Sequence, residues 1–127
     1  MDITPLIPEG RQIIESYGDG RFRVSGARID GSALVFPTRA VAWAVADVGA
    51  LTADSLAEVI AAARAGEVDL LLLGCGVRAA LIPQALRATL RAAGIVVEAM
   101  DTGAACRTYN VLMAEGRRVA AALIAVA

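Results

Sequence analysis

The stretch VDLLLLGCG, residues 68–76, says more about the fold than any other part of this sequence. Its apolar run extends from Val68 to Leu73 and is interrupted only by Asp69. Such a run is typical of a strand that is covered on both faces, as the strands of parallel sheets are. We therefore predict a buried strand over residues 68–73.

Helices and strands alternate on either side of this strand. Thr52 stands at an N-cap position before apolar residues at helical spacing, and Gly66 lies just past the predicted helix end. After the strand, Pro83 opens a helix that Gly94 closes. The remaining predicted elements are a strand over residues 95–99, a helix over about 103–115 capped by Thr102, and a strand over 119–126. This succession predicts an α/β fold. Its right-handed crossovers make the strands over residues 68–73 and 95–99 parallel.

The front of the chain carries a β-type pattern. Residues 1–20 are expected to form a mostly irregular lead-in without a helix, ending at the turn Gly18-Asp19-Gly20. Phe22 and Val24 then alternate with arginines, and an apolar run over 33–36 leads into Pro37. Residues 40–46 place Trp43 on the same face as two valines, which makes it a core residue. We predict an antiparallel β region here, within a single domain of residues 1–127.

Composition excludes several kinds of chemistry. The chain has 127 residues, of which 57% are apolar, and a formal net charge of −1. All 12 basic residues are arginine, and the sequence contains no histidine. Lysine Schiff bases, the P-loop lysine, histidine-based triads and histidine-containing metal sites are therefore excluded. We expect no cofactor and no metal.

The sequence also argues against nucleic-acid binding and membrane insertion. Arginines do not cluster beyond pairs, and only five residues are aromatic. The longest unbroken apolar run, residues 119–127, has nine residues, whereas a spanning helix needs about 20. No export or import signal precedes Arg21, so a cytoplasmic location is expected. Cys75 and Cys106 are then expected to be free thiols.

Two glycine-containing segments follow the predicted parallel strands. Gly74-Cys75-Gly76 follows the first, and Met100-Asp101-Thr102-Gly103 follows the second. Ligands of open α/β sheets bind beyond the carboxyl ends of such strands, where the helix N-terminus and Arg107 could hold an anion. The alternative is that these residues only shape loops and cap the helix, with Asp101 as the N-cap carboxylate. Both cysteines lie near helix N-termini, yet without an activating base we interpret them as inert.

The densest group of polar and aromatic side chains lies further along the last predicted helix. This group comprises Arg107, Thr108, Tyr109 and Asn110. Helical spacing distributes these residues over more than one face. They either bind a ligand or partner, or they hydrogen-bond neighbouring loops, with Arg107 paired to a carboxylate such as Asp101 or Glu115.

One longer string carries a family resemblance. It reads MDTGAACRTYNVLMAEGRRVAAALI, residues 100–124, and is supported by Tyr17-Gly18, by LLGCG at residues 72–76, and by Pro83 before Gly94-Ile95. This string resembles the family of small bacterial and archaeal proteins of unknown function that includes the mitochondrial respiratory complex I assembly factor three. The resemblance implies a three-layer α/β domain whose central mixed sheet has one antiparallel strand, for which the last strand is the natural candidate. It also implies that the protein acts through protein partners.

We therefore predict a non-enzymatic domain that binds proteins and assists the assembly of a respiratory or other membrane complex. The alternative is a small anionic-ligand or enzymatic site at the crevice between Gly74–Gly76 and Asp101–Arg107. The candidate site residues are Gly74, Cys75, Gly76, Asp101, Thr102, Arg107, Thr108, Tyr109 and Asn110.

Overall fold

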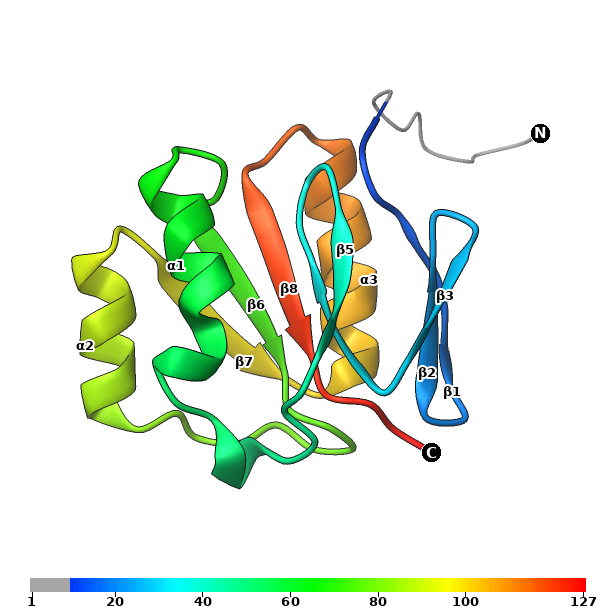
Figure 1. Ribbon diagram of the computed structural model, residues 1–127, viewed down its shortest axis with the longest axis horizontal. Helices are drawn as coiled ribbons and strands as arrows, with labels where there is room; N and C mark the ends of the chain where they lie inside the picture. The colour runs from blue at the N-terminus through cyan, green and yellow to red at the C-terminus, as the bar shows by residue number, and fades with distance from the viewer. Residues whose placement is uncertain (1–9) are drawn as a thin grey trace.

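A computed structural model describes residues 10–127 and shows a mixed α/β fold with two sheets (Figure 1). The strands are β1 (Ile14–Gly18), β2 (Arg21–Val24), β3 (Ala27–Asp30), β4 (Ser32–Val35), β5 (Ala40–Trp43), β6 (Leu70–Gly74), β7 (Val96–Met100) and β8 (Val119–Leu123). The helices are α1 (Ala57–Arg64), α2 (Gln84–Ala92) and α3 (Thr102–Ala114), and two short 3-10 turns, Val48–Ala50 and Asp54–Leu56, precede α1. Strands β1–β2–β3 form one sheet, and the other has the order β5–β4–β8–β6–β7.

The larger sheet is mixed, and a single strand runs against the others. β6 pairs in parallel with β7, as predicted from the crossover connection, and it also pairs in parallel with β8. β4 is antiparallel to both of its neighbours, β5 and β8. The sheet therefore has one antiparallel strand, but our assignment of this role to the last strand was wrong. β4 takes it because it enters the sheet as half of a hairpin with β5, whereas β8 follows a crossover helix.

Each face of the larger sheet is covered by a separate apolar core. Leu71 and Leu73 of β6 pack with residues of α1 and α2, whereas Leu72 packs with residues of α3 and the smaller sheet. This alternation follows from the period of two along a strand. Figure 1 shows the resulting layers: α1 and α2 on one side, the five-stranded sheet between, and α3 beside the three-stranded sheet on the other. The prediction of a strand covered on both faces is confirmed for β6, which begins at Leu70 rather than at Val68, because Asp69 is half exposed and pairs with Arg118.

The lead-in is more regular than predicted, because residues 14–18 form β1. Residues 1–9 of that predicted lead-in lie outside the described residues. Two tight hairpins join β1, β2 and β3, with positive φ at Asp19 (54°) and Gly20 (72°) and again at Ser25 (47°) and Gly26 (84°). Positive φ at both central residues is the geometry that matches the twist of a hairpin.

Other element ends also differ from prediction. α1 begins at Ala57, because the Thr52 hydroxyl accepts a hydrogen bond from the Ser55 N–H in a preceding 3-10 turn. The predicted strand over 40–46 ends at Trp43, which is buried as expected. Asp101, not Thr102, is the N-cap of α3, since its carboxylate accepts from the Ala104 N–H.

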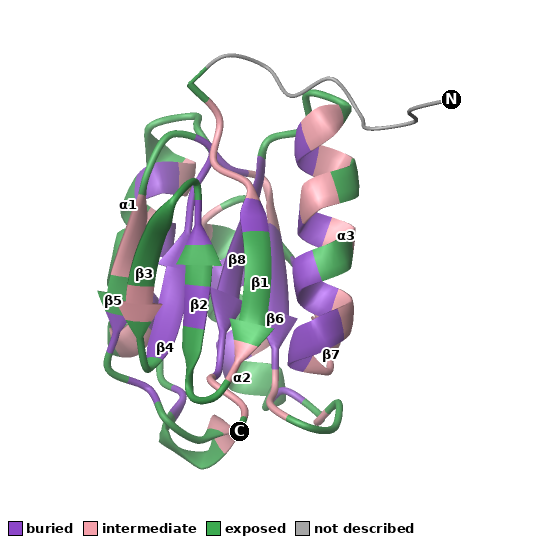
Figure 2. Ribbon diagram, turned by 90° about the vertical axis from the view of Figure 1, so that its right-hand side faces the viewer, coloured by how far each residue is buried: buried purple, intermediate pink, exposed green. Residues whose placement is uncertain are grey.

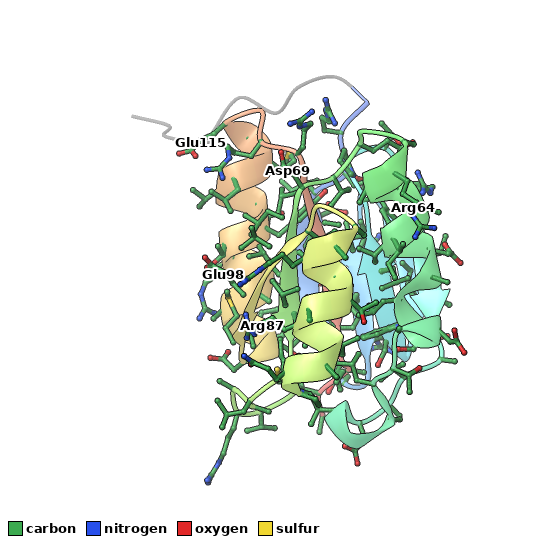
Figure 3. All side chains as sticks on the ribbon, turned by 90° about the vertical axis from the view of Figure 1, so that its left-hand side faces the viewer. Arg64, Asp69, Arg87, Glu98 and Glu115 are labelled. Carbon is green, nitrogen blue, oxygen red and sulfur yellow. The ribbon has the colours of Figure 1, made fainter. Side chains whose placement is uncertain are left out.

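The β7 edge of the larger sheet is partly protected by α2. The Arg87 guanidinium donates to the Val97 carbonyl over 3.1 Å, and Figure 3 shows this arginine beside β7. This contact occupies one backbone acceptor of the edge strand, a position that otherwise invites pairing with another chain. None of the helices in residues 10–127 is both long and apolar enough to cross a membrane.

Leu72 provides a test of the two-sided burial of β6. Leu72→Asp places a carboxylate at a position with 0% exposure, and an unpaired buried carboxylate costs several kcal/mol against a total stability of about 5–15 kcal/mol. We expect an insoluble or unfolded variant by circular dichroism. Val96→Asp, at a 62% exposed position of neighbouring β7, is the matched control and should fold. A soluble Leu72→Asp variant with unchanged melting would contradict the burial of this face.

Candidate functional site

The carboxyl ends of the parallel strands are joined by the buried hydroxyl of Thr102. Its Oγ1 donates to the Ile124 carbonyl over 2.7 Å and accepts from the Gly76 N–H over 2.9 Å. The Thr102 N–H in turn donates to the Gly76 carbonyl over 2.8 Å. One residue thus connects the start of α3 to the chain after β6 and to the end of β8. Thr102 is fully buried, and its bond to the Ile124 carbonyl forms away from solvent.

The backbone around Thr102 leaves little space for a ligand. A Cβ atom on Gly74 would lie 3.0 Å from the Thr102 Cα, so glycine permits the close approach of β6 and α3. The Cys75 N–H donates to the Met100 carbonyl over 2.8 Å. The Asp101 carboxylate occupies the Ala104 N–H over 2.9 Å. These N–H groups already donate hydrogen bonds within the protein, so they are not available to bind an anion.

The two thiols occupy different environments. Cys75 is half-buried, and its Sγ lies 3.7 Å from the Leu73 carbonyl oxygen as a weak donor. Cys106 is buried, and burial raises the pKa of its thiol to about 12, an effect that nearby Arg107 opposes and Asp101 reinforces. A thiol with this pKa stays protonated at neutral pH, whereas a nucleophile must be thiolate. The geometry of Cys106 therefore agrees with an inert thiol.

The polar group on α3 joins the helix to the front of the chain. Asn110 Oδ1 accepts from the Ile14 N–H over 2.9 Å, and its Nδ2 donates to the Ile14 carbonyl over 2.7 Å. The side-chain amide thus bonds β1 as a neighbouring strand would. The buried Tyr109 hydroxyl lies 3.2 Å from the carbonyl oxygens of both Gln12 and Phe36. Asn110 and Tyr109 therefore hold the lead-in and the small sheet in place.

Arg107 does not make the carboxylate pair considered from the sequence. Its Nη1 lies 3.2 Å from the Tyr17 hydroxyl, and the ion pairs found within residues 10–127 do not join it to Asp101 or Glu115. Tyr17 also packs against Gly103, where a Cβ would meet its hydroxyl. Beside this contact lies an open hollow of about 380 Å³ whose lining includes Tyr17, Cys106 and Arg107.

The structure thus divides the candidate residues into two groups. Five of them meet at the strand ends: Gly74, Cys75, Gly76, Asp101 and Thr102. Arg107, Tyr109 and Asn110 lie instead at the junction of α3 with the front of the chain, and Thr108 is half-buried elsewhere on α3. The candidate residues predicted from the sequence did not include Tyr17, although Tyr17-Gly18 supported the family resemblance. They also did not include Ser32, a buried residue whose hydroxyl accepts from the Ala125 N–H over 3.0 Å.

These features define a class of protein: a mixed α/β domain in which the usual ligand edge of the parallel strands is closed by a buried threonine and by glycine-mediated packing. The chain belongs to the family described as "Protein of unknown function (DUF498/DUF598)", whose model matches residues 14–124.

Proteins similar in sequence to this chain occur in bacteria and in vertebrates. An uncharacterized protein of Rhodobacter capsulatus is 43% identical over 112 residues, which cover 87% of this chain and 82% of the relative. Human NADH dehydrogenase [ubiquinone] 1 alpha subcomplex assembly factor 3 is 32% identical over 111 residues, covering 87% of this chain and 59% of the human protein. The chain therefore spans little more than half the length of that relative.

Solved structures share the fold closely. The crystal structure of a Bartonella henselae protein, described as an outer membrane protein, has a TM-score of 0.85 and 36% identity over 93% of this chain and 98% of that one. A solution structure of a Bordetella pertussis protein, described as a Mth938-like domain, has a TM-score of 0.83 and 31% identity over 98% and 92% of the two chains.

The Thr102 hydroxyl can be tested with two conservative substitutions. Thr102→Val keeps the shape but leaves the Gly76 N–H and the Ile124 carbonyl unpaired in the interior, at a cost of about 1–3 kcal/mol per group. Thr102→Ser keeps the hydroxyl and loses one methyl group, a loss of about 1 kcal/mol. Urea denaturation should therefore show the valine variant to be the less stable of the two. Equal stability would refute the structural role of the hydroxyl.

The buried Cys106 thiol predicts a loss of stability at alkaline pH. Its pKa rises on folding from the ordinary 9.0 to about 12, so the folded protein holds this proton more tightly than the unfolded chain. The stabilising contribution is complete below about pH 9 and declines as pH rises from 9 toward 12. We expect melting temperatures to fall less steeply above pH 9 in Cys106→Ala than in wild type. Parallel curves for the two proteins would disprove this effect.

Proposed function

We propose that this protein binds protein partners without catalysing a reaction, and that it assists the assembly of a respiratory or other membrane complex. The observation that carries the proposal is its relation to vertebrate proteins named NADH dehydrogenase [ubiquinone] 1 alpha subcomplex assembly factor 3, which are 31% to 37% identical to it. The alignment with the human protein covers 87% of the chain, and the family model matches residues 14–124, which include the strands of both sheets.

The loop between β6 and α2 supports a role in protein binding. Val77 is 81% exposed and Leu81 is 97% exposed, so two apolar side chains of one loop lie almost entirely in solvent. The loop is fixed at one end by the Gly76 bonds to Thr102 and at the other by buried Ile82. A loop whose two ends are anchored loses less backbone conformational entropy on binding than a free segment does. We assign a contact with the protein partner to this loop.

The enzymatic or anion-binding alternative has weaker support. The backbone N–H groups of Cys75, Gly76 and Ala104 already have partners within the protein. Arg107, the cation that this alternative requires, is turned toward Tyr17. We therefore retain Arg107 and Thr108 as candidate partner contacts rather than as ligand-binding groups.

The proposal includes a cytoplasmic location and a single domain over residues 1–127. The Bartonella henselae protein of similar fold is described as an outer membrane protein, which makes location a useful test. Fractionation of the native host, with a tag on the chain and markers for each compartment, should place the protein in the cytoplasmic fraction or on the cytoplasmic side of the inner membrane. Recovery in the outer membrane would contradict this part of the proposal.

A deletion strain of the native host tests the function itself. Native gels of its membranes should show less fully assembled complex I, or less of another membrane complex, and expression of the wild-type chain should restore the level. The double variant Val77→Ser with Leu81→Ser should fold but fail to restore it, because the loop loses the apolar surface that a partner would bury.

Two exposed valines outside the loop provide the control for this experiment. Val96 of β7 and Val111 of α3 are 62% and 58% exposed, and their serine variants should restore assembly. Unchanged membrane complexes in the deletion strain would refute the assembly role. Full rescue by the loop variant would refute only the assignment of the loop.

A further inference from the structure

The smaller sheet turns a basic face to solvent. In β2 the side chains alternate, so that Phe22 and Val24 are buried while Arg21 and Arg23 are exposed. Figure 2 shows the three strands in front of the rest of the molecule, with no described element covering their outer side. Arg28 of β3 lies on the same outer side, because it is the register partner of Arg23.

The cross-strand register places like charges opposite each other. Arg23 lies directly opposite Arg28, and Arg21 lies opposite Asp30. Like charges in such positions destabilise a sheet, so this arrangement has a cost that folding alone does not explain. Arg28 reduces it by pairing with Asp30 over 2.7 Å. Within residues 10–127, neither Arg21 nor Arg23 has a carboxylate oxygen within 4.0 Å.

The charge of this face differs from that of the whole chain. Three arginines, Arg21, Arg23 and Arg28, stand against one aspartate in the paired rows, whereas the chain has a formal net charge of −1. The arginines line a hollow of about 310 Å³ together with Ser16 and Asp19, so the turn before β2 adds one carboxylate beside them. A guanidinium presents parallel N–H donors that match both oxygens of a carboxylate. The face is therefore complementary to carboxylates presented along a strand.

We propose that this basic face binds an extended acidic segment of a protein partner, with a carboxylate at every second residue. This inference rests on the proposed function, and it names the chemistry of the partner. Arg21 and Arg23 are two residues apart on one strand, about 6.6–6.8 Å along its axis. An extended segment repeats its side chains on one face at the same interval, so acidic residues at positions i and i+2 can meet both arginines.

Other anionic partners fit this face less well. Single-stranded nucleic acids need aromatic rings for their bases, but Phe22 is only 1% exposed and Tyr17 is turned toward Gly103 and Arg107. Apart from Tyr17, the large exposed apolar side chains of the described residues lie on the loop after β6, on β7 and on α3. The outer face of β1–β3 thus lacks the large apolar groups that would insert into a membrane surface.

Nuclear magnetic resonance titration of the purified protein tests the proposal directly. The probe is a short synthetic peptide that alternates aspartate with threonine, and its control alternates asparagine with threonine. We expect the aspartate peptide to shift amide resonances of β1–β3 and the asparagine peptide to leave them unchanged. Shifts confined to other elements would overturn the proposal, as would equal shifts by both peptides.

Charge substitutions separate this face from the general electrostatics of the protein. Arg23→Gln and Arg23→Glu should weaken peptide binding by about tenfold or more, because a charge-assisted hydrogen bond is lost. The matched control is Arg64→Glu on α1, an exposed arginine on the opposite side of the molecule (Figure 3). It should bind as wild type does. Equal weakening in the control would overturn the proposal.

A stability measurement distinguishes a binding role from a structural one. Arg23→Glu replaces a like-charge pair with an attractive pair to Arg28, so this variant should melt no lower than wild type while binding is lost. A lower melting temperature would show that Arg23 serves the fold and would overturn the proposal. Anionic vesicles or an oligonucleotide that bind this face while the aspartate peptide does not would also overturn it.

The peptide experiment and the deletion strain fail independently. Binding of the aspartate peptide to purified protein does not depend on any membrane complex. Failure of the peptide to bind, with assembly still impaired in the deletion strain, would leave the proposed function intact and remove only the acidic segment. Peptide binding without an assembly defect in the deletion strain would refute the proposed function but would leave the binding of an acidic segment intact.

Discussion

The hydroxyl of Thr102 is the interaction on which the arrangement of the larger sheet depends. It connects the start of α3 to the chain after β6 and to the end of β8 through bonds of 2.9 and 2.7 Å. Because Gly74 carries no Cβ, the helix can lie close enough for both bonds to form. The same contacts occupy the edge where α/β proteins usually bind ligands. A single buried residue therefore connects three parts of the chain and occupies the edge at which a ligand would otherwise bind.

Those surfaces are supported by a second set of interior bonds. Asn110 bonds both backbone groups of Ile14 and so attaches β1 of the small sheet to α3. Tyr109 approaches two further carbonyls just outside that sheet, and the small sheet has no strand paired with the larger one. This attachment holds the arginine-bearing face at a fixed orientation. The apolar loop after β6 projects elsewhere, beyond the strand ends (Figure 1). The two surfaces that we propose as binding sites therefore lie on separate parts of the molecule.

How much of the fold and of the candidate site could be predicted depends on how far apart in the sequence the residues of each contact lie. The buried strand β6 and its parallel neighbour follow from local apolar runs, and the helix end at Gly94 follows from a glycine with φ of 84°. Strand β1 was missed because its pairing includes a bulge and its outer bonds come from Asn110, 96 residues away. The contact between Tyr17 and Arg107 spans 90 residues. No local pattern encodes such partners.

The central place of β8 has a consequence for biosynthesis. On one edge β8 pairs with β4, where Leu34 is the register partner of Ala122, and on the other it pairs with β6. A ribosome delivers the chain from its N-terminus, so β4 leaves the exit tunnel long before its partner exists. Until β8 arrives, the nascent sheet has an open edge on each side of a missing strand, and both apolar layers are exposed. The larger sheet therefore closes only after residues 119–123 have left the ribosome, although the other four of its strands are synthesised earlier.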